Sequence, residues 1–230
     1  MPVLNEERLL LKTLAHTAAL GFEELIVVDG GSRDRTREIV QAFQLSSTLH
    51  SALGTVKLLT TPSERAHQMN AGAAVSRGDV LLFLHADTRL PSDAGESVAR
   101  ALEDTHCVGG RFDVCFEPDS GWRWVISRMM NLRSRWTGIA TGDQALFVRR
   151  AVFERLGGFA DIPIMEDVEF TRRLKRAGRI AALRTPVKTS YRRWQTGGPL
   201  RTILLMWTLR SLYWLGISPR TLSHLYGEAR

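Results

Sequence analysis

The sequence has little of what marks several common protein classes. Its 230 residues contain two cysteines, Cys107 and Cys115, too few for a disulfide framework and typical of a reducing compartment. It has neither a charged-then-apolar signal segment at its start nor a run of 18 uncharged apolar residues. These absences argue against a disulfide-rich secreted protein and a membrane-spanning protein, so we expect a cytoplasmic protein.

Two nucleotide-binding signatures are missing as well. The sequence contains no G-x-G-x-x-G fingerprint and no G-x-x-x-x-G-K-[ST] phosphate loop, which disfavours NAD enzymes and P-loop ATPases. Its composition otherwise fits a globular protein, since 44% of the residues are hydrophobic and no repeat or low-complexity stretch is present.

Charge is distributed unevenly along the chain, whose net charge is +7. Residues 172–230 carry 13 Lys and Arg against one acid, Glu228, whereas residues 1–171 carry 18 basic and 23 acidic side chains. The basic C-terminal quarter indicates an anionic partner, for which nucleic acid, phospholipid headgroups and a phosphorylated substrate are candidates. The alternative is a basic face that is simply solvated.

The hydrophobic pattern predicts strands that alternate with helices, as in a mostly parallel sheet with crossover helices. Predicted strands cover residues 24–29, 56–60, 79–85, 110–117 and 145–149, and predicted helices cover residues 34–43, 63–75, 92–103, 166–177, 199–215 and 219–229. Residues 110–117 alternate with period two, which predicts a half-exposed antiparallel strand. Ser92 is expected to cap its helix. Residues 1–4 resemble the second half of a strand, so we expect a first strand of about three residues in a single α/β domain.

Polar residues follow three of the apolar runs. Asn5 and Glu6 follow the first, Asp29 the second, and His85-Ala86-Asp87 the strand that ends near residue 84. Because ligands bind at the carboxyl ends of parallel strands, these positions predict a binding rim. A single Asp after a strand is more often a turn former or a helix cap.

Two of these positions allow alternative interpretations. Arg65 lies in the first turn of a predicted helix, where a cation opposes the helix dipole, so either a bound anion or an acid such as Glu64 is expected beside it. His85 and Asp87 offer ligands for Mg²⁺ or Mn²⁺, although a buried His beside a capping Asp is equally common.

Glu166 and Asp167 begin a predicted helix, where carboxylates are favourable for the dipole. The functional alternative is a general base, which contributes about 10²- to 10⁴-fold in rate.

Taken in order, these motifs resemble those of family 2 glycosyltransferases with a GT-A fold, over residues 2–195. The motifs are Pro2-Val-Leu-Asn-Glu6, Val27-Val-Asp-Gly-Gly-Ser32, Phe83-Leu-His-Ala-Asp87 and Glu166-Asp167. Finer motifs resemble the arsenosugar-biosynthesis-type subgroup, namely Gln68-Met-Asn-Ala-Gly72, Leu84-His-Ala-Asp-Thr88, Thr141-Gly-Asp-Gln144 and Arg192-Arg-Trp194.

The resemblance implies a Rossmann-like central sheet flanked by helices and a role for each matching residue. Leu4, Asn5, Glu6, Asp29, Gly30, Asn70 and Ala86 would line the nucleotide sugar, and Arg65 would meet its diphosphate. Asp87, with His85, would hold a divalent cation, Mg²⁺ or Mn²⁺. Asp167, with Glu166 beside it, would be the general base, and Gly142, Asp143, Gln144, Arg193 and Trp194 would border the sugar and the acceptor.

The resemblance therefore implies an inverting transferase that moves a sugar from a nucleotide-diphosphate sugar to an acceptor hydroxyl. The alternative is a non-catalytic protein that binds a nucleotide sugar or a membrane surface. A sugar-nucleotide pyrophosphorylase lacks support because no Gly-rich loop with Arg and Lys lies near the N-terminus. We expect no nucleic-acid partner, since the basic tail contains no recognised module.

Three positions depart from the family pattern. Gly30 stands where the family has a second Asp, His85 takes the first place of the Asp-x-Asp motif, and Thr189-Ser190 stand where a further His ligand is usual. The pattern leaves Asp87 as the one secure metal ligand.

The last segment, residues 196–230, is expected to form basic amphipathic helices that pack on the same domain as residues 1–195. Residues 203–217 are apolar around most of a helix and include the Trp and Tyr that favour membrane interfaces. Flanking Arg192, Arg193, Arg201 and Arg220 would add about 1 kcal/mol each near an anionic leaflet. We therefore expect peripheral association with the inner face of a membrane, or a homodimer through these helices, or packing on the catalytic domain.

Overall fold

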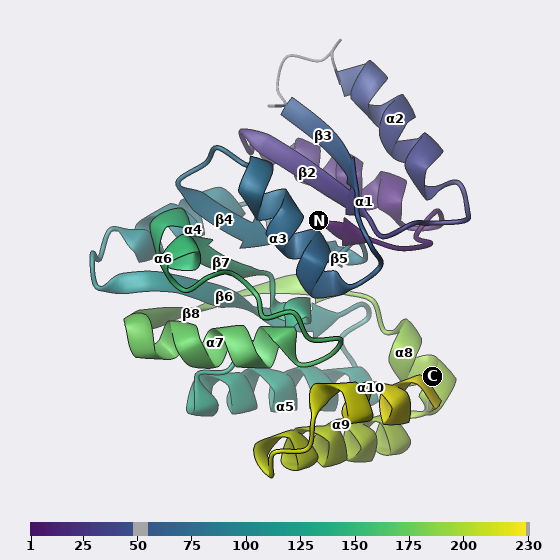
Figure 1. Ribbon diagram of the computed structural model, residues 1–230, viewed down its shortest axis with the longest axis vertical. Helices are drawn as coiled ribbons and strands as arrows, with labels where there is room; N and C mark the ends of the chain where they lie inside the picture. Colours follow the sequence, from purple (N-terminus) through teal and green to yellow (C-terminus); the bar gives the residue numbers. More distant parts are fainter. Residues whose placement is uncertain (48–54, 229–230) are drawn as a thin grey trace.

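The structure, a computed structural model, describes residues 1–47 and 55–228. The described chain forms helices packed around two β-sheets (Figure 1). In chain order the elements are β1 (Pro2–Val3), α1 (Leu10–Ala18), β2 (Glu24–Asp29), α2 (Thr36–Ser47), β3 (Thr55–Thr60), α3 (Arg65–Val75), β4 (Val80–Phe83), β5 (Thr88–Arg89), α4 (Ala94–Leu102), β6 (Cys107–Phe116), α5 (Trp122–Thr137), the 3₁₀ turn η1 (Gly142–Gln144), β7 (Leu146–Arg149), α6 (Arg150–Arg155), α7 (Glu166–Ala177), β8 (Arg179–Thr189), α8 (Arg192–Gly197), α9 (Pro199–Trp214) and α10 (Pro219–Glu228).

The first sheet is parallel and small. Its order is β1-β2-β3, with Val3 opposite Asp29 and Asp29 opposite Thr60. The run Val27-Val28 is almost fully buried, which explains why these residues form a continuous apolar strand rather than an alternating one. The first strand is two residues long, close to the short strand expected from the sequence.

The second sheet is mixed and has the order β4-β7-β6-β8-β5. Strand β4 pairs antiparallel with β7, so Asn5, Glu6 and Asp29 follow strands of the parallel sheet while His85 and Asp87 follow a strand of the other sheet. Parallel pairing is thus confined to β1-β2-β3 and to β6 with β8. The expected α/β architecture is confirmed, with its strands divided between two sheets.

Strand β6 corrects the prediction for residues 110–117. It lies between β7 and β8, antiparallel to the first and parallel to the second. Most of its residues are buried, and Arg111, predicted on the exposed face, is 2% exposed. The predicted alternation holds from Phe112 to Glu117, where Phe112, Val114 and Phe116 are buried, Asp113 and Cys115 are half-buried and Glu117 is exposed. It fails at Arg111, and the antiparallel pairing holds for β7 alone.

Most predicted elements are present within two or three residues of their expected ends. Strand 24–29 and helix 166–177 have the predicted bounds. The helix predicted from Ser92 begins at Ala94 with Asp93 at its N-cap position, so the Ser92 cap is wrong. The predicted end of the last helix, Ala229, lies outside the described residues. Elements that the pattern did not predict are α1, α5, α6, α8, β5 and β8.

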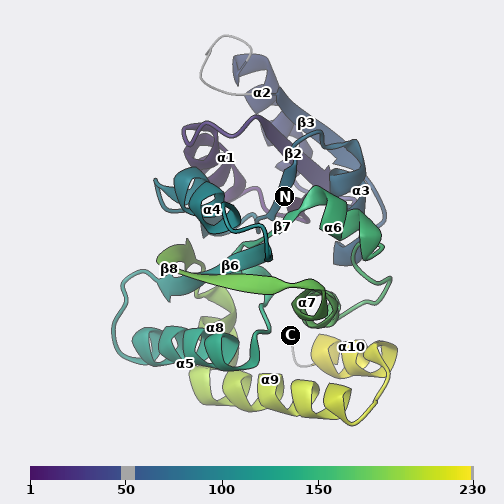
Figure 2. The same ribbon diagram turned by 90° about the vertical axis from the view of Figure 1, so that its left-hand side faces the viewer.

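The C-terminal helices pack beneath the second sheet. Leu209 of α9 and Leu222 of α10 are buried in one cluster with Met165 and Val168, at the start of α7 (Figure 2). The apolar side of this segment therefore packs on the element that carries Glu166 and Asp167. None of the helices in the described ranges is long and apolar enough to cross a bilayer.

Candidate functional site

The loops after β1 and β2 are joined by hydrogen bonds between backbone and side chains. The backbone N–H of Asn5 donates to Ser32 Oγ over 2.9 Å, and the side-chain Oδ1 of Asn5 accepts the backbone N–H of Arg33 over 2.8 Å. The Glu6 N–H donates to Thr36 Oγ1 over 2.8 Å. Asn5 has a φ of 54°, a left-handed conformation that Asn tolerates better than most residues. These bonds fix the backbone from which Leu4, which is 42% exposed, and Glu6 project.

Asp29 is fully buried and forms the turn after β2. Its carboxylate accepts the backbone N–H groups of Gly31 and Ser32 at 3.1–3.2 Å. This is the turn-forming alternative that the sequence left open. The expected contact of Asp29 with a nucleotide stays a prediction.

Gly30 lies where no side chain fits. A Cβ at this position would lie 3.0 Å from Gln68 Nε2 and 3.1 Å from the Ser63 Cα. Gln68 Nε2 itself donates to the carbonyls of Val3 and Val28, and so ties α3 to β1 and β2. A side chain at position 30 would therefore need Gln68 or the backbone at Ser63 to shift by a few tenths of an ångström.

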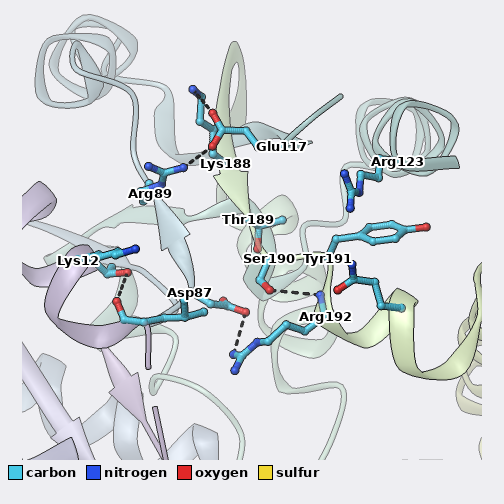
Figure 3. A pocket seen from close by; sticks show the side chains of 13 residues that line it. Lys12, Asp87, Arg89, Glu117, Arg123, Lys188, Thr189, Ser190, Tyr191 and Arg192 are labelled. Atoms are coloured by element: carbon cyan, nitrogen blue, oxygen red, sulfur yellow. Dashed lines mark hydrogen bonds and ion pairs between the residues drawn. The ribbon is translucent and has the colours of Figure 1, made fainter. Parts of the chain in front are cut away.

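Glu6 and Asp87 share one cation, Arg192. Arg192 Nη2 lies 3.0 and 2.9 Å from the two Glu6 carboxylate oxygens and 3.5 Å from Asp87 Oδ2. Figure 3 shows the Arg192 side chain extending from α8 to Asp87. Burial raises the pKa of Glu6, and the Arg192 hydrogen bond and charge oppose this shift. Arg192 is a cation held between two carboxylates, and a divalent metal ion would be held by the same kind of oxygen atoms. Glu6 and Asp87 therefore form a donor set that suits Mg²⁺ or Mn²⁺.

His85 does not join this pair. Its Nδ1 lies 3.3 Å from Asp143 Oδ1, and its Nε2 is buried against Gly142. Among the described residues no ion pair links His85 to Asp87. Joint ligation of a metal by His85 and Asp87 stays a prediction, and the His85 ring extends toward the η1 turn. Burial raises the pKa of Asp143, but the His85 hydrogen bond and the charges of His85, Arg193 and Arg65 lower it by more. The pKa of Asp143 therefore lies below its ordinary value, and this partner of His85 stays ionised.

The start of α7 brings Glu166 and Asp167 to the η1 turn and to α3. Arg65 Nη1 lies 3.3 Å from Glu166 Oε1. An acid therefore lies beside Arg65, as one of the two alternatives expected, and this acid is the sequence-distant Glu166. Asp167 Oδ2 accepts the Gly142 N–H over 2.8 Å, and Asp167 Oδ1 accepts the Val168 N–H over 2.7 Å. Burial and the Asp167 charge raise the pKa of Glu166, against the opposing charge of Arg65. The structure thus brings Arg65, Glu166, Asp167 and Gly142 together.

Three predicted site residues have structural partners instead. Asn70 exchanges two 2.9 Å hydrogen bonds with the Phe159 backbone. Gln144 is fully buried, and its Oε1 accepts the Thr141 N–H. Ala86 is 4% exposed, and its carbonyl accepts the Thr13 hydroxyl. Each therefore supports the backbone around the site, and its direct contact with substrate stays a prediction.

Arg193 and Trp194 lie in α8 among aromatic rings. The Arg193 guanidinium carbon lies 5.1 Å from the centre of the Tyr226 ring of α10, and Trp194 stacks on Tyr191 at 6.4 Å. The charge of Arg193 also acts on Asp143. Helix α8 therefore contacts α10 through Arg193, whose charge also acts on Asp143 of the η1 turn.

Two features of this region were not found in the sequence. Arg192 was noted as part of the Arg192-Arg-Trp194 motif and as a flanking charge, but nothing in the sequence links it to Glu6. Glu64, His67 and Asp161 bring three ligand atoms within 4.8 Å of one another, and His67 Nε2 lies 2.8 Å from Asp161 Oδ1. The i, i+3 spacing of Glu64 and His67 is the one signal that would have indicated this group.

A hollow of about 390 Å³ opens beside Asp87. Figure 3 shows it between α1 and the start of α8, with Lys12, Arg123 and Tyr191 among its lining residues. Arg123 lies 4.9 Å from the centre of the Tyr191 ring, while Arg89 and Lys188 both pair with Glu117. Among the charged side chains that line the hollow, cations therefore outnumber acids.

Comparison with known proteins identifies what shares this arrangement. The model of the family described as "Glycosyl transferase family 2" matches residues 1–157. Undecaprenyl-phosphate 4-deoxy-4-formamido-L-arabinose transferase of Pseudomonas aeruginosa (strain LESB58) is 36% identical over 157 residues, which cover 65% of this chain and 44% of that protein. The chain thus spans less than half the length of this curated relative.

Solved structures match over more of the chain. S. aureus TarS 1–349 in complex with UDP superposes with a TM-score of 0.65 at 20% identity, covering 82% of this chain and 58% of that one. The mannosyltransferase PcManGT from Pyrobaculum calidifontis, in complex with GDP-Man and Mn²⁺, gives a TM-score of 0.61 at 23% identity, covering 80% and 53%. The expected GT-A fold is confirmed by these neighbours, and the resemblance to the arsenosugar-type subgroup stays a prediction.

Proposed function

The chain belongs to glycosyltransferase family 2, and we propose on this basis that it moves a sugar from a nucleoside-diphosphate sugar to an acceptor hydroxyl, with inversion at the anomeric carbon. The observation that carries the proposal is the presence of two groups of carboxylates, Glu6 with Asp87 and Glu166 with Asp167. Glu6 and Asp87 share the cation Arg192, and Asp167 is held by the Gly142 N–H. The segment that carries Asp87 also reaches the η1 turn, because His85 lies 3.3 Å from Asp143.

The barrier of such a transfer has two parts, a weak nucleophile and a leaving diphosphate that gains negative charge. A divalent cation held by Asp87 and Glu6 would supply electrostatic stabilisation of that diphosphate. Arg65 lies 44% exposed at the start of α3 and offers a further positive charge. PcManGT was solved with GDP-Man and Mn²⁺, and TarS with UDP, which supports a nucleotide-sugar donor and a divalent metal.

Asp167 is the proposed general base. The Gly142 N–H orients Asp167 Oδ2 toward the η1 turn, beside Asp143. A carboxylate on the face opposite the leaving group predicts single displacement and hence inversion, because no second carboxylate is required as a nucleophile. Glu166 instead pairs with Arg65 and has its pKa raised, so its proposed part is to position Arg65.

A panel of nucleoside diphosphates and their sugars, with and without Mn²⁺, tests the proposal. We expect one nucleotide to raise the melting temperature in a Mn²⁺-dependent manner, and its sugar conjugate to be consumed in a transfer or hydrolysis assay. Binding without any turnover would support the alternative, a non-catalytic nucleotide-sugar binding protein. Absence of binding across the panel would overturn the proposal.

The acceptor side and the membrane belong to the same proposal. Large apolar side chains of α5 and α9 are exposed: Trp122, Trp124, Met129, Leu132 and Trp136 on α5, and Leu200, Leu204, Trp207 and Trp214 on α9. The two helices lie side by side in both views (Figures 1 and 2), and their residues include Arg but no Asp or Glu. Aromatic and cationic side chains without acids suit an anionic bilayer surface. The relative named above acts on undecaprenyl phosphate according to its name, which agrees with peripheral association with the inner face of a membrane.

Vesicle flotation tests this surface. We expect the protein to float with phosphatidylglycerol vesicles, and Trp136→Glu with Leu204→Glu to prevent it. Leu11→Glu, at an exposed leucine of α1, is the matched control. A homodimer in gel filtration that the same two substitutions dissociate, without flotation of the wild type, would replace the membrane by a second copy.

A further inference from the structure

A second hollow, of about 610 Å³, shares no lining residue with the hollow beside Asp87. It lies where α5 ends, the second half of α7 passes and α9 ends, and Figure 2 shows α7 nearly end-on with α5 and α9 below it. Its volume is within the range of ligand sites, about 300–1,000 Å³. Three cations and no acid are among its lining residues, which are Thr137, Ile139, Arg172, Lys175, Arg176 and Trp214.

The three cations lie on one face of α7. Arg172, Lys175 and Arg176 follow one another at i, i+3 and i+4, the spacing at which helical side chains are neighbours and like charges destabilise the helix. Basic residues in the last turn favour the helix dipole, which accounts for Lys175 and Arg176. Arg172 lies before that turn, so the dipole does not explain why a third cation stands beside the other two.

No carboxylate neutralises these cations within residues 1–47 and 55–228, where none of the three forms an ion pair. Helices α5 and α9 contain no Asp or Glu. The acids of α7 are bound elsewhere: Glu166 by Arg65, Asp167 by the Gly142 N–H, and Glu169 by Arg173. The positive charge of the hollow is therefore open to an anion from outside the chain.

Two contacts hold the cations in place without neutralising them. Lys175 Nζ donates to the carbonyl oxygen of Thr137, the last residue of α5, over 2.6 Å. The guanidinium carbon of Arg172 lies 5.7 Å from the centre of the Trp214 ring, within the range of a cation–π contact. A guanidinium stacked on a ring still presents the N–H groups at its edge, which suit the oxygens of a phosphate. The hollow is thus a positioned set of donors for that group.

The rim of the hollow is apolar and exposed. Trp136, which precedes Thr137, is 88% exposed, and Leu215, which follows Trp214, is 79% exposed, the two highest values among the large apolar side chains of the described residues. They continue the apolar surface of α5 and α9 that is proposed above to contact a membrane. Tryptophan and cations beside an apolar surface are typical of the headgroup level of a bilayer.

We propose that Arg172, Lys175 and Arg176 bind the phosphate of an anionic phospholipid, so that the hollow is a headgroup site at the membrane surface. The inference rests on the membrane contact in the proposed function and adds a discrete site to it. A soluble phosphate would give no reason for the apolar rim, whereas a lipid has an apolar part beside its phosphate. Because α7 carries Asp167 in its first turn, a lipid bound here would also fix the helix that holds the proposed base.

Co-sedimentation of the full chain with phosphatidylcholine vesicles, with and without phosphatidylglycerol, tests the site. We expect phosphatidylglycerol to strengthen binding of the wild type about tenfold or more, and Arg172→Gln with Arg176→Gln to abolish that gain. Arg37→Gln with Arg100→Gln, at exposed arginines of α2 and α4, removes the same charge and should bind as the wild type does. An equal loss in both double variants would show general attraction of a basic protein and overturn the site.

A charge-preserving variant separates a phosphate site from a charged surface. Arg172→Lys with Arg176→Lys keeps the net charge but loses the planar guanidinium donors, and we expect it to bind phosphatidylglycerol vesicles about threefold more weakly or worse. Unchanged binding would overturn the site. Inorganic phosphate and glycerol 1-phosphate are the soluble probes. If they raise the melting temperature through these arginines while phosphatidylglycerol gives no gain, the site is one for a soluble phosphate and the lipid proposal is wrong.

Nucleotide binding and turnover distinguish this inference from the proposed transferase. The Gln double variant should bind a nucleoside diphosphate with Mn²⁺, and consume its sugar conjugate, as the wild type does. A wild type that consumes the nucleotide sugar but gains nothing from phosphatidylglycerol would leave the transferase standing and overturn the headgroup site. Vesicle binding through these arginines without any nucleotide binding would do the reverse.

Discussion

Arg192 and Glu6 are 186 positions apart in the chain and are joined by two contacts of 2.9 and 3.0 Å. The same guanidinium nitrogen lies 3.5 Å from Asp87 Oδ2, so it occupies the position between the two carboxylates where a divalent cation would be held. Under the proposed function, a metal held by these carboxylates would require Arg192 to leave them, and the donor diphosphate is an anion to which it could move.

Removing the Arg192 charge should strengthen metal binding in the absence of donor. For Arg192→Gln we expect Mn²⁺ alone to bind about fivefold more tightly or better, since unit charges 4 Å apart interact by about 1 kcal/mol in water and more near a protein surface. Electron paramagnetic resonance of free Mn²⁺ measures this directly. Arg201→Gln is the control, and unchanged or weaker Mn²⁺ binding in Arg192→Gln would refute the exchange.

Asp167→Asn should lower sugar transfer at least 100-fold while leaving nucleotide binding intact. The amide still accepts the Gly142 N–H through its oxygen but does not take a proton from the acceptor. Turnover and nucleotide affinity are measured on the same preparation. Asp104→Asn, whose carboxylate pairs with Arg179 at the far end of β8, is the matched control. Near-wild-type turnover would exclude Asp167 as the base.

Glu166 should make stability depend on pH in a defined direction. Burial and the Asp167 charge raise its pKa in the folded state, so the native protein binds a proton more readily than the unfolded chain. Its contribution is therefore fully present below the unfolded pKa, about 4.3, and is lost as pH rises through the folded value, by about 1.4 kcal/mol for each unit of difference.

Urea unfolding at several pH values checks this expectation. The free energy of unfolding of Glu166→Gln, relative to wild type, should increase as pH rises from 4.5 to 8. Glu103→Gln, at an exposed position after α4, should show no such trend. A difference that stays constant or falls with pH would contradict the burial of an ionisable Glu166.

Gly142→Ala should disturb the η1 turn. An added Cβ would lie 2.3 Å from His85 Nε2, so the His85 ring has to move away from Asp143. We expect a loss of about 1–3 kcal/mol in unfolding free energy, as for overpacked cores, and lower activity. Gly95→Ala, in α4, meets no heavy atom within 4 Å and should be neutral or slightly stabilising. Equal stability of both variants would show that His85 adapts freely.

The local pattern of the sequence predicted elements whose signals lie within a few residues. The continuous apolar run of β2 and the acidic start and Gly178 end of α7 gave those elements their observed bounds. Helix α5 was missed because Trp and Arg residues interrupt its apolar period, and β8 because Pro186 and charged residues break its alternation. The formation of α5 and of β8 depends on contacts with residues that are distant in sequence.

Site residues were predicted by type more successfully than by role. Glu6 and Asp87 share Arg192, whereas Asp167 accepts the Gly142 N–H and its neighbour Glu166 pairs with Arg65. Asn70 and Gln144 have structural hydrogen bonds instead, because side-chain direction depends on the neighbouring segment, such as the Phe159 backbone or Thr141.

The chain's own sequence determined the family, the α/β alternation and the identity of the acidic residues, because periodicity, turn chemistry and ordered motifs act over short distances along the chain. Only the tertiary structure decided that Arg192 reaches Glu6, that His85 faces Asp143, and that Arg65 pairs with Glu166. Those relationships arise when β4 joins the second sheet and the C-terminal helices pack on α7, which brings together charges that the linear sequence keeps apart.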